Sequence, residues 1–206
     1  MTTFIDEFQI SDLTLCDSLL QLYNDAHDRG MTFAGQSGAM GQARPEIKAS
    51  TDFWLNDCDK LGPPEKYRWP EFQAELNGFI DQYLEKYRFF EYGGMFTSRH
   101  LPQIQWYKPG EGYHKWHIDG AQMSACDRAM VYMTYLNDVT EGGGTMFYHQ
   151  NVTTKAVKGK TLIFPAGYTH LHKGEISETQ HKYILTGWIW CCLLYTSPSP
   201  RDSIAS

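Results

Sequence analysis

The sequence lacks long apolar runs and an N-terminal secretion signal. No stretch of roughly 18 apolar residues occurs anywhere in the 206 residues, so no transmembrane helix is expected. At the N-terminus, Asp6 and Glu7 stand where a signal peptide would carry positive charge and then an apolar core. We therefore expect a cytoplasmic protein with no membrane partner.

Clusters of basic residues are also absent. The chain has 18 Lys and Arg against 24 Asp and Glu, a net charge of -6, and no basic run forms a stripe that could follow a phosphate backbone. Nucleic acid is therefore not expected as a partner. No feature of the sequence predicts an oligomeric state.

Cysteines are few, and their spacing shows no pairs. An odd number of thiols without a disulfide pattern predicts reduced side chains. Two of them are adjacent in an expected strand, so they face opposite ways. We interpret all five as packing residues: Cys16, Cys58, Cys126, Cys191 and Cys192.

The length favours one folded domain. A chain of 23.7 kDa can bury one good core and is short for two. We expect a single domain over residues 1–194, with helical support and a loop in 1–100 and the β core in 101–194. Residues 195–206 are rich in Ser and Pro and are expected to form a disordered tail outside the domain.

Helical periodicity is confined to the N-terminal half. Residues 11–28 begin with capping side chains and continue with leucines at intervals of three and four. Residues 69–87 have a proline near their start and an apolar stripe. Between these helices, residues 29–45 hold four glycines and are expected to form a flexible loop, with an edge strand possible in 47–55.

From about residue 103 the pattern changes to short β-rich runs separated by turn signals. These runs predict a mainly-β fold with N-terminal helices, in the form of a jelly roll or a barrel. The eight expected strands are 103–108, 115–119, 129–136, 144–149, 152–157, 160–164, 170–176 and 183–192.

One pair of residues on these strands suggests a metal site. His117 and Asp119 are two positions apart on an expected strand, so their side chains point to the same side. With His172 they form a set of two imidazoles and one carboxylate, which holds Fe(II) and leaves coordination positions open. Lys182, ten residues after His172, supplies a cation suited to an acidic cosubstrate. A His-x-Asp pair alone is a weak signal, because chance occurrences are common.

Three further segments strengthen this signal. Residues 106–113 form a strand that ends in a turn, 135–145 form a glycine-containing strand-turn-strand, and 162–188 carry the distal histidine and the lysine. In this order, residues 103–190 resemble an Fe(II)- and 2-oxoglutarate-dependent dioxygenase of the prolyl 4-hydroxylase-like branch. The resemblance implies a double-stranded β-helix, which is a jelly roll of eight core strands.

The resemblance also assigns the metal ligands. They fall on His117, Asp119 and His172, which would be the catalytic iron centre. His170 is the alternative distal ligand, since it has the same alternation. Only His172 is followed after one residue by a glycine and after ten by a basic residue, as in the family, so His170 is interpreted as a supporting neighbour.

A cosubstrate site is implied beside the metal. The resemblance places Lys182 at the distal carboxylate of 2-oxoglutarate, whose burial requires a cation. A lysine makes one compact contact and needs a hydroxyl partner, for which we choose Tyr135. Tyr107 matches a second family tyrosine near the cosubstrate. The alternatives are a solvated edge residue for Lys182 and a core aromatic residue for Tyr107.

The last expected strand contributes further pocket residues. Thr186 and Trp188 alternate with Lys182 and Ile184, so they share its inward face and are expected to line the cosubstrate pocket. Arg128 is interpreted as a loop residue or a substrate contact.

The resemblance implies the reaction and its cofactors. These are Fe(II), 2-oxoglutarate and O2, with ascorbate as a further candidate, and the products include succinate and CO2. Because Asp119 is retained, hydroxylation is expected in place of halogenation. The leading substrate is a prolyl residue of a peptide or protein, which the 29–45 loop would cover as a lid; a variable surface loop is the equal alternative.

Two other functions stay open at this point. One is hydroxylation of a free amino acid or other small molecule. The other belongs to a different class, a non-catalytic cupin-like module that binds a structural or sensing metal. Lys182 with Tyr135 favours the enzyme, because a structural metal site needs no second anion pocket.

Overall fold

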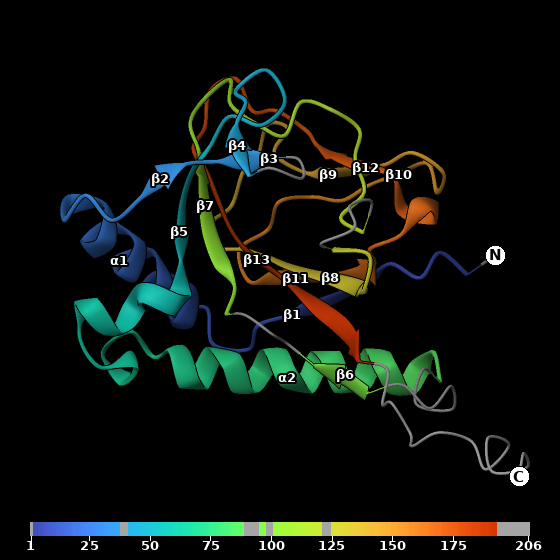
Figure 1. The fold of residues 1–206 in the computed structure, drawn as a ribbon, viewed down its shortest axis with the longest axis horizontal. Helices are drawn as coiled ribbons and strands as arrows, with labels where there is room; N and C mark the ends of the chain where they lie inside the picture. The colour runs from blue at the N-terminus through green and yellow to red at the C-terminus, as the bar shows by residue number, and fades with distance from the viewer. Residues whose placement is uncertain (1, 38–40, 89–94, 98–100, 121–124, 193–206) are drawn as a thin grey trace, which may run out of the picture.

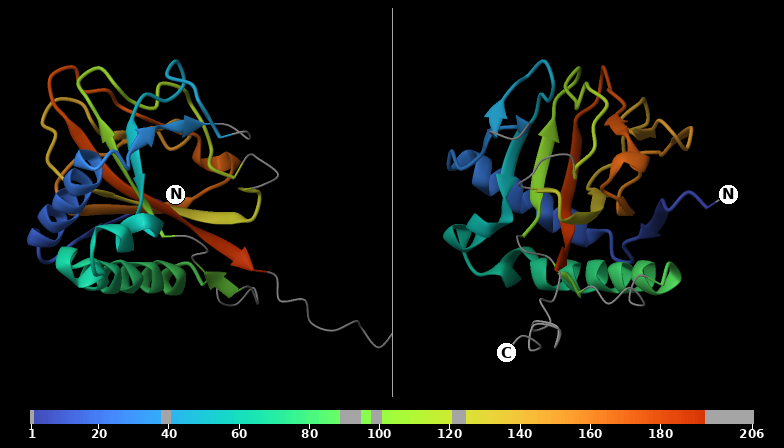
Figure 2. Two further views of the ribbon diagram at one scale, coloured as in Figure 1. Left: turned by 60° about the vertical axis from the view of Figure 1, so that its left-hand side comes forward. Right: turned by 45° about the vertical axis from the view of Figure 1, so that its right-hand side comes forward.

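Helices on one side of a large antiparallel sheet and a small sheet on the other make up the fold (Figures 1 and 2). Helices α1 (Thr14–Asp28) and α2 (Trp69–Lys86) cover the outer face of the large sheet. The computed structural model describes residues 2–37, 41–88, 95–97, 101–120 and 125–192.

The large sheet has the order β1-β11-β8-β13-β7-β5-β2, and β6 pairs with β13 outside this path. Every pair of neighbours is antiparallel. Its strands are β1 (Asp6–Gln9), β2 (Phe33–Ala34), β5 (Thr51–Trp54), β6 (Met95–Thr97), β7 (Gln103–Tyr107), β8 (Arg128–Tyr135), β11 (Lys160–Pro165) and β13 (Lys182–Cys192).

Two smaller sheets and short helical turns complete the described structure. The three-stranded sheet β10-β9-β12 faces the inner side of the large sheet, and β3 and β4 form a two-stranded sheet. The strands are β3 (Gln36–Ser37), β4 (Gln42–Ala43), β9 (Thr145–Phe147), β10 (Val152–Thr153) and β12 (His172–Gly174), and the 3-10 turns are η1 (Leu55–Leu61), η2 (Pro64–Tyr67) and η5 (Tyr168–His170).

Alternation along the strands gives the large sheet two separate cores. On β8, Met130 and Tyr132 pack with the helices, whereas Val131 and Tyr135 face the small sheet. The helix-side core includes Leu19, which is fully buried, and each such side chain contributes roughly 1.5–3 kcal/mol to folding. Many side chains of the inner core line a pocket.

The mainly-β class with N-terminal helices is confirmed. The first helix begins at Thr14, where Asp12 Oδ1 accepts hydrogen bonds from the backbone N–H (3.0 Å) and the hydroxyl of Thr14 (2.6 Å). The second helix, expected over 69–87, covers Trp69–Lys86. Seven of the expected strand positions carry strands, with altered bounds.

The expected strand 115–119 is wrong. His117 forms one isolated bridge with His172, in which their backbone groups exchange hydrogen bonds of 2.9 and 3.0 Å. The chain then turns away at Gly120, whose N–H donates to the carbonyl of Ala166 (2.9 Å). A single bridge and a turn leave no partner strand for the residues on either side.

Three other expected strands are too long. The runs 144–149 and 152–157 reduce to β9 and β10, because the chain turns between them through Asn151, at a φ of 53°. The run 170–176 reduces to β12, since His170 belongs to the preceding 3-10 turn.

The N-terminal hundred residues contribute more β structure than expected. β1, which was not expected, pairs with β11, and the strand expected as possible within 47–55 is present as β5, which pairs with β7 in the large sheet. The glycine-containing 29–45 loop includes β2, β3 and β4, although four glycines suggested only flexibility.

Three other expectations concern cysteines, membranes and the tail. Cys16, Cys58 and Cys191 are free thiols, and burial raises the pKa of Cys16 to about 12. Among the described residues, no helix has the length and apolar character needed to cross a bilayer. The tail 195–206 lies outside the described residues.

Candidate active site

A pocket of about 240 Å³ lies between the inner face of the large sheet and the small sheet. Strand register explains its floor. Cross-strand pairs on β5, β7 and β13 form rows that point to the same face. The rows that line the pocket are Tyr107 with Lys182; Asp52, Gln105 and Ile184; and Trp54, Gln103 and Thr186.

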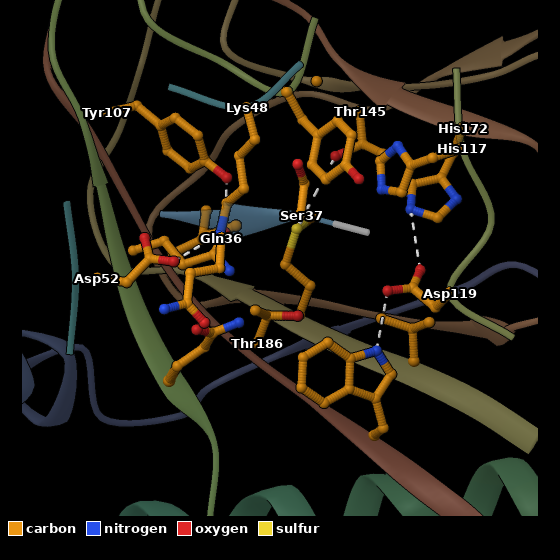
Figure 3. A pocket seen from close by; sticks show the side chains of 18 of the residues that line it. Gln36, Ser37, Lys48, Asp52, Tyr107, His117, Asp119, Thr145, His172 and Thr186 are labelled. Carbon is orange, nitrogen blue, oxygen red and sulfur yellow. Dashed lines mark hydrogen bonds and ion pairs between the residues drawn. The ribbon is translucent and has the colours of Figure 1, made fainter. Parts of the chain in front are cut away.

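Three potential metal ligands meet on the opposite wall. One ligand atom from each of His117, Asp119 and His172 lies within 4.8 Å of the others (Figure 3). His172 comes from β12, and the bridge described above brings His117 beside it. Tyr113 stacks on the His117 ring with centroids 3.5 Å apart. The structure therefore brings the sequence-predicted triad together.

Backbone carbonyls orient both imidazoles. His117 Nδ1 lies 3.1 Å from the carbonyl of Lys115, and His172 Nδ1 lies 2.8 Å from that of His170. A carbonyl can only accept, so each Nδ1 carries a proton, and in the neutral ring Nε2 then keeps its lone pair. Both rings thus present an Nε2 acceptor, which is the form that binds a metal.

The Asp119 carboxylate has one engaged and one available oxygen. The Trp188 indole N–H donates to Oδ1 at 2.9 Å, and Arg128 stacks on the Trp188 ring at 3.8 Å. Oδ2 is buried and accepts no hydrogen bond from the described residues, although His172 Nε2 lies 3.3 Å away. When that nitrogen carries no proton, two electron pairs face each other, and a cation between them relieves the repulsion.

The pKa shifts of His117 and Asp119 favour the protonation states in which these side chains bind a metal. Burial, reinforced by the neighbouring His172, lowers the pKa of His117 to about 3, which keeps its ring neutral. Burial opposes the ionisation of Asp119, but the two imidazoles and the Trp188 hydrogen bond outweigh it and lower the pKa of the carboxyl. Neutral imidazoles and a carboxylate are the donors that a divalent metal requires.

A second part of the pocket surrounds Lys182. Its ammonium lies over the Tyr107 ring, 4.9 Å from the centroid, and donates to the carbonyl of Glu175 at 3.4 Å. Burial lowers its pKa to about 8, against the opposing effect of the Glu175 charge. A buried ammonium with one long hydrogen bond has the capacity to bind an anion.

The two tyrosines expected near the cosubstrate line the same pocket. The Tyr135 hydroxyl is hydrogen-bonded to the hydroxyls of Thr145 (2.8 Å) and Thr154 (3.0 Å), and burial raises its pKa to about 12. The Tyr107 hydroxyl donates to Gln105 Oε1 at 2.6 Å, and burial raises its pKa well above the ordinary value. Tyr107, through its ring, is the tyrosine in contact with Lys182.

The pocket also contains the remaining candidates. Thr186 and Trp188 line it together with Ile184 and Lys182, as their alternation predicted. His170 does not line it, because its Nε2 is held by the carbonyl of Thr3 at 2.9 Å. Its own carbonyl supports His172, so it acts as the expected neighbour.

Sequence reasoning missed a polar cluster on and before β5. Lys48 and Asp52 line the pocket, and Ser50 bonds to Asp52. The signal was present, because polar side chains at 48, 50 and 52 alternate with smaller or apolar neighbours and so share one face. It was hidden by the low β propensity of the glycine-containing loop before it.

Comparison with protein-family models finds a match in the β-rich part of the chain. The model described as the 2OG-Fe(II) oxygenase superfamily matches residues 102–190. No curated protein sequence matches the chain significantly.

Solved structures with the same fold include several prolyl hydroxylases. One from Trichoplax adhaerens, in complex with a hypoxia inducible factor peptide fragment, has a TM-score of 0.72 at 18% identity, covering 92% of this chain and 84% of that one. A Pseudomonas putida prolyl-4-hydroxylase has a TM-score of 0.65 at 20% identity, covering 91% and 92%. A viral collagen prolyl hydroxylase from Paramecium Bursaria Chlorella virus-1, as its 2OG complex, has 0.61 at 21%, covering 90% and 95%.

Proposed function

We propose that this chain, whose residues 102–190 match the model of the 2OG-Fe(II) oxygenase superfamily, hydroxylates an unactivated C–H bond of a prolyl residue in a peptide or protein. The chain is a 2-oxoglutarate-dependent dioxygenase, whose cofactors are Fe(II), 2-oxoglutarate and O2. The proposed reaction releases succinate and CO2. The prolyl hydroxylases among the structural neighbours support the choice of substrate.

One observation carries this proposal. The same pocket contains three metal donors, too few to fill the coordination sphere of an iron ion, and the buried ammonium of Lys182, which is not one of them. The donors are the Nε2 atoms of His117 and His172 and Oδ2 of Asp119, which accepts no hydrogen bond from the part of the chain that the structure describes. Two imidazoles and one carboxylate fit Fe(II) and leave positions for a chelating cosubstrate and oxygen.

Each ligand residue has a defined role in this proposal. His117, His172 and Asp119 hold the iron, and the hydrogen bond from Trp188 to Oδ1 directs Oδ2 toward it. Bound iron and 2-oxoglutarate supply the oxidising chemistry, while the protein supplies position. The retained Asp119 occupies the ligand position that a halogenase would leave for halide, which favours hydroxylation.

Lys182 is proposed to bind the distal carboxylate of 2-oxoglutarate. Its ammonium has three N–H donors and makes one hydrogen bond to a backbone carbonyl among the described residues, and it lies over the Tyr107 ring. Tyr135, through its hydroxyl network with Thr145, and Thr186 border the same space. A charged anchor and neighbouring hydroxyls would orient the cosubstrate with its other end toward the metal.

The two alternatives make different demands on the pocket. A free amino acid would be enclosed, whereas a peptide must extend out of the pocket, which Gln36 and Ser37 of β3 and the nearby Gly41 help to line. A non-catalytic metal module has no use for the Lys182 subsite. The Lys182 subsite thus favours the enzyme over the metal module, and the prolyl hydroxylases among the structural neighbours support the choice of a prolyl substrate.

Substrate-dependent turnover tests the proposal. We expect blocked proline-containing peptides to stimulate succinate formation from 2-oxoglutarate and to gain one oxygen atom, with Fe(II) present and ascorbate tested as an additive. The Asp119→Ala variant should lower succinate formation to background, because the metal loses one of its ligands. An Asp57→Ala variant, which removes an exposed carboxylate, is the matched control.

The outcomes separate the candidate functions. Succinate formation that free amino acids stimulate and peptides do not would favour the small-molecule alternative. A protein that binds metal but consumes no 2-oxoglutarate would be the non-catalytic module. Turnover by Asp119→Ala close to the wild-type rate would contradict the ligand assignment.

A further inference from the structure

A buried ion pair lies in the pocket and includes neither the proposed metal ligands nor Lys182. Lys48 Nζ lies 2.5 Å from Asp52 Oδ2, and their side chains are only 4% and 1% exposed. The Ser50 hydroxyl donates to the other carboxylate oxygen at 2.7 Å. Figure 3 shows Lys48 and Asp52 on one side of the pocket and the triad of His117, Asp119 and His172 on the other.

The hydrogen bonds of this cluster are unevenly satisfied. Both oxygens of Asp52 are engaged, but the Lys48 ammonium has three donors and makes one side-chain hydrogen bond within the described part of the chain. Ser37 is 8% exposed, and its hydroxyl has no partner among the described residues. Ser37 and Lys48 both line the pocket.

Unused buried donors are costly unless a ligand completes them. Leaving a buried polar group without a partner is unfavourable, and native structures contain few such groups. A buried ion pair by itself gives little stability, so packing alone does not explain why Lys48 and Asp52 face a pocket. Lys48 and Ser37 both have N–H or O–H donors without a partner among the described residues, so the group that would complete the cluster is a hydrogen-bond acceptor.

We propose that Lys48 and Ser37 bind a carbonyl or carboxylate oxygen of the substrate and that Asp52 positions the Lys48 ammonium. This inference rests on the proposed function and makes the polar cluster the substrate-binding side of the pocket. Because Asp52 already balances the lysine charge, a neutral peptide carbonyl is as suitable an acceptor as the carboxylate of a free amino acid. Lys182, on another strand, serves the cosubstrate.

Binding to the loaded enzyme tests this inference. The protein carries Mn(II) and 2-oxoglutarate, and the probes are N-acetyl-L-prolinamide, which offers carbonyls, and free L-proline, which offers a carboxylate. The variant is Lys48→Met/Asp52→Asn, which removes both charges and leaves no unpaired ion. We expect it to weaken binding of the accepted probe at least about tenfold, while 2-oxoglutarate affinity changes by less than about twofold.

The chain offers a matched control pair. Lys60 and Asp57 also form an ion pair, but their side chains are 63% and 46% exposed, and neither lines the pocket. The variant Lys60→Met/Asp57→Asn makes the same chemical changes on the surface. It should bind both probes and 2-oxoglutarate as the wild type does.

A second variant keeps the test valid if the double variant does not fold. Ser37→Ala introduces no charge and removes a buried hydroxyl that has no hydrogen-bond partner among the described residues. We expect it to melt no lower than the wild type and to bind the accepted probe about threefold to tenfold more weakly. A purely structural serine would show no loss of probe binding.

Three outcomes would overturn the inference. They are unchanged probe binding in folded Lys48→Met/Asp52→Asn and Ser37→Ala, an equal loss of 2-oxoglutarate affinity, and a loaded wild-type protein that binds neither probe. If L-proline alone binds, the acceptor is a carboxylate, and if the amide alone binds, it is a peptide carbonyl; either supports the site. Failure of the wild type to bind 2-oxoglutarate would instead contradict the proposed function.

Discussion

At the scale of single residues, the Asp119 carboxylate divides its oxygens between two tasks. Oδ1 accepts the Trp188 indole N–H, and Oδ2 is kept free of hydrogen bonds from the described residues. The indole therefore fixes the direction in which the carboxylate can coordinate. Arg128, stacked on the same indole, holds the ring in place.

The Trp188→Phe variant should weaken metal binding. Phenylalanine keeps a ring for Arg128 to stack on but removes the donor to Oδ1. The loss of a hydrogen bond that orients a ligand typically lowers metal affinity about tenfold to 100-fold, which a Mn(II) titration would measure. Trp54→Phe is the control, because Trp54 lines the pocket without bonding to Asp119. Equal Mn(II) affinity in both variants would contradict this role of the indole.

The charge of Lys182 should make 2-oxoglutarate binding depend on pH. Burial lowers the pKa of the free ammonium to about 8, so it loses its proton as the pH rises through that value. The dissociation constant of 2-oxoglutarate should stay level below about pH 7 and rise about tenfold by pH 9, because only the charged form binds the carboxylate. Calorimetric titration at fixed ionic strength would measure it.

Lys182→Arg provides the comparison for this pH dependence. Its guanidinium keeps its charge over the whole range, so its affinity for 2-oxoglutarate, strong or weak, should not change between pH 7 and 9. A wild-type affinity that is equally flat would mean that another group binds the distal carboxylate.

At the scale of elements, β13 connects the site to the helical side of the molecule. Its residues alternate, so that Lys182, Ile184 and Thr186 line the pocket while Leu185 and Ile189 pack in the helix-side core. Gly187 continues the second set, opposite Tyr132 on β8. A Cβ at position 187 would come within 2.2 Å of the Tyr132 hydroxyl oxygen.

Two alanine substitutions should therefore have opposite effects on stability. Gly187→Ala would force the Tyr132 ring out of its place and lower the free energy of unfolding by about 1–3 kcal/mol. Gly78 lies within α2, and a Cβ at this position would meet open space. Gly78→Ala should therefore raise the free energy of unfolding by roughly 0.5–1 kcal/mol. Urea denaturation would measure both. A stable Gly187→Ala protein would mean that β13 and β8 can separate without loss.

The elements also show what sequence patterns can predict. Helices at 69–87 and strands such as 103–108 were predictable, because periodicity reports which face is buried. The triad residues and Lys182 were identified through spacing and resemblance, and the structure brings them into one pocket.

Other features depend on contacts that no local pattern contains. The segment around His117 forms a bridge in place of a strand, because its partner lies 55 residues further along the chain. The Lys48–Asp52 pair becomes notable only when β5 is placed beside β7. Short strands within a glycine-containing loop give too weak a local signal to predict.

At the scale of the whole molecule, the two faces of the large sheet serve different purposes. Among the described residues, the helix-side core contains most of the fully buried large side chains, whereas the inner face combines apolar residues with donors and acceptors that have no partner within that part of the chain. The first core supports the fold without ligands. The second leaves polar groups buried at a cost that bound metal and cosubstrate would offset.

Ligand-dependent melting should reveal this division. Mn(II) with 2-oxoglutarate, each at about 100 times its dissociation constant, should add roughly 2.7 kcal/mol per site to the stability of the wild type. For a domain of this size, each kcal/mol raises the melting temperature by about 2–4 °C, which differential scanning fluorimetry resolves. Asp119→Ala should lose the shift from Mn(II), and Lys182→Met should keep that shift but lose most of the one from 2-oxoglutarate. Equal loss of both shifts in Lys182→Met would mean that Lys182 supports the fold and not the cosubstrate.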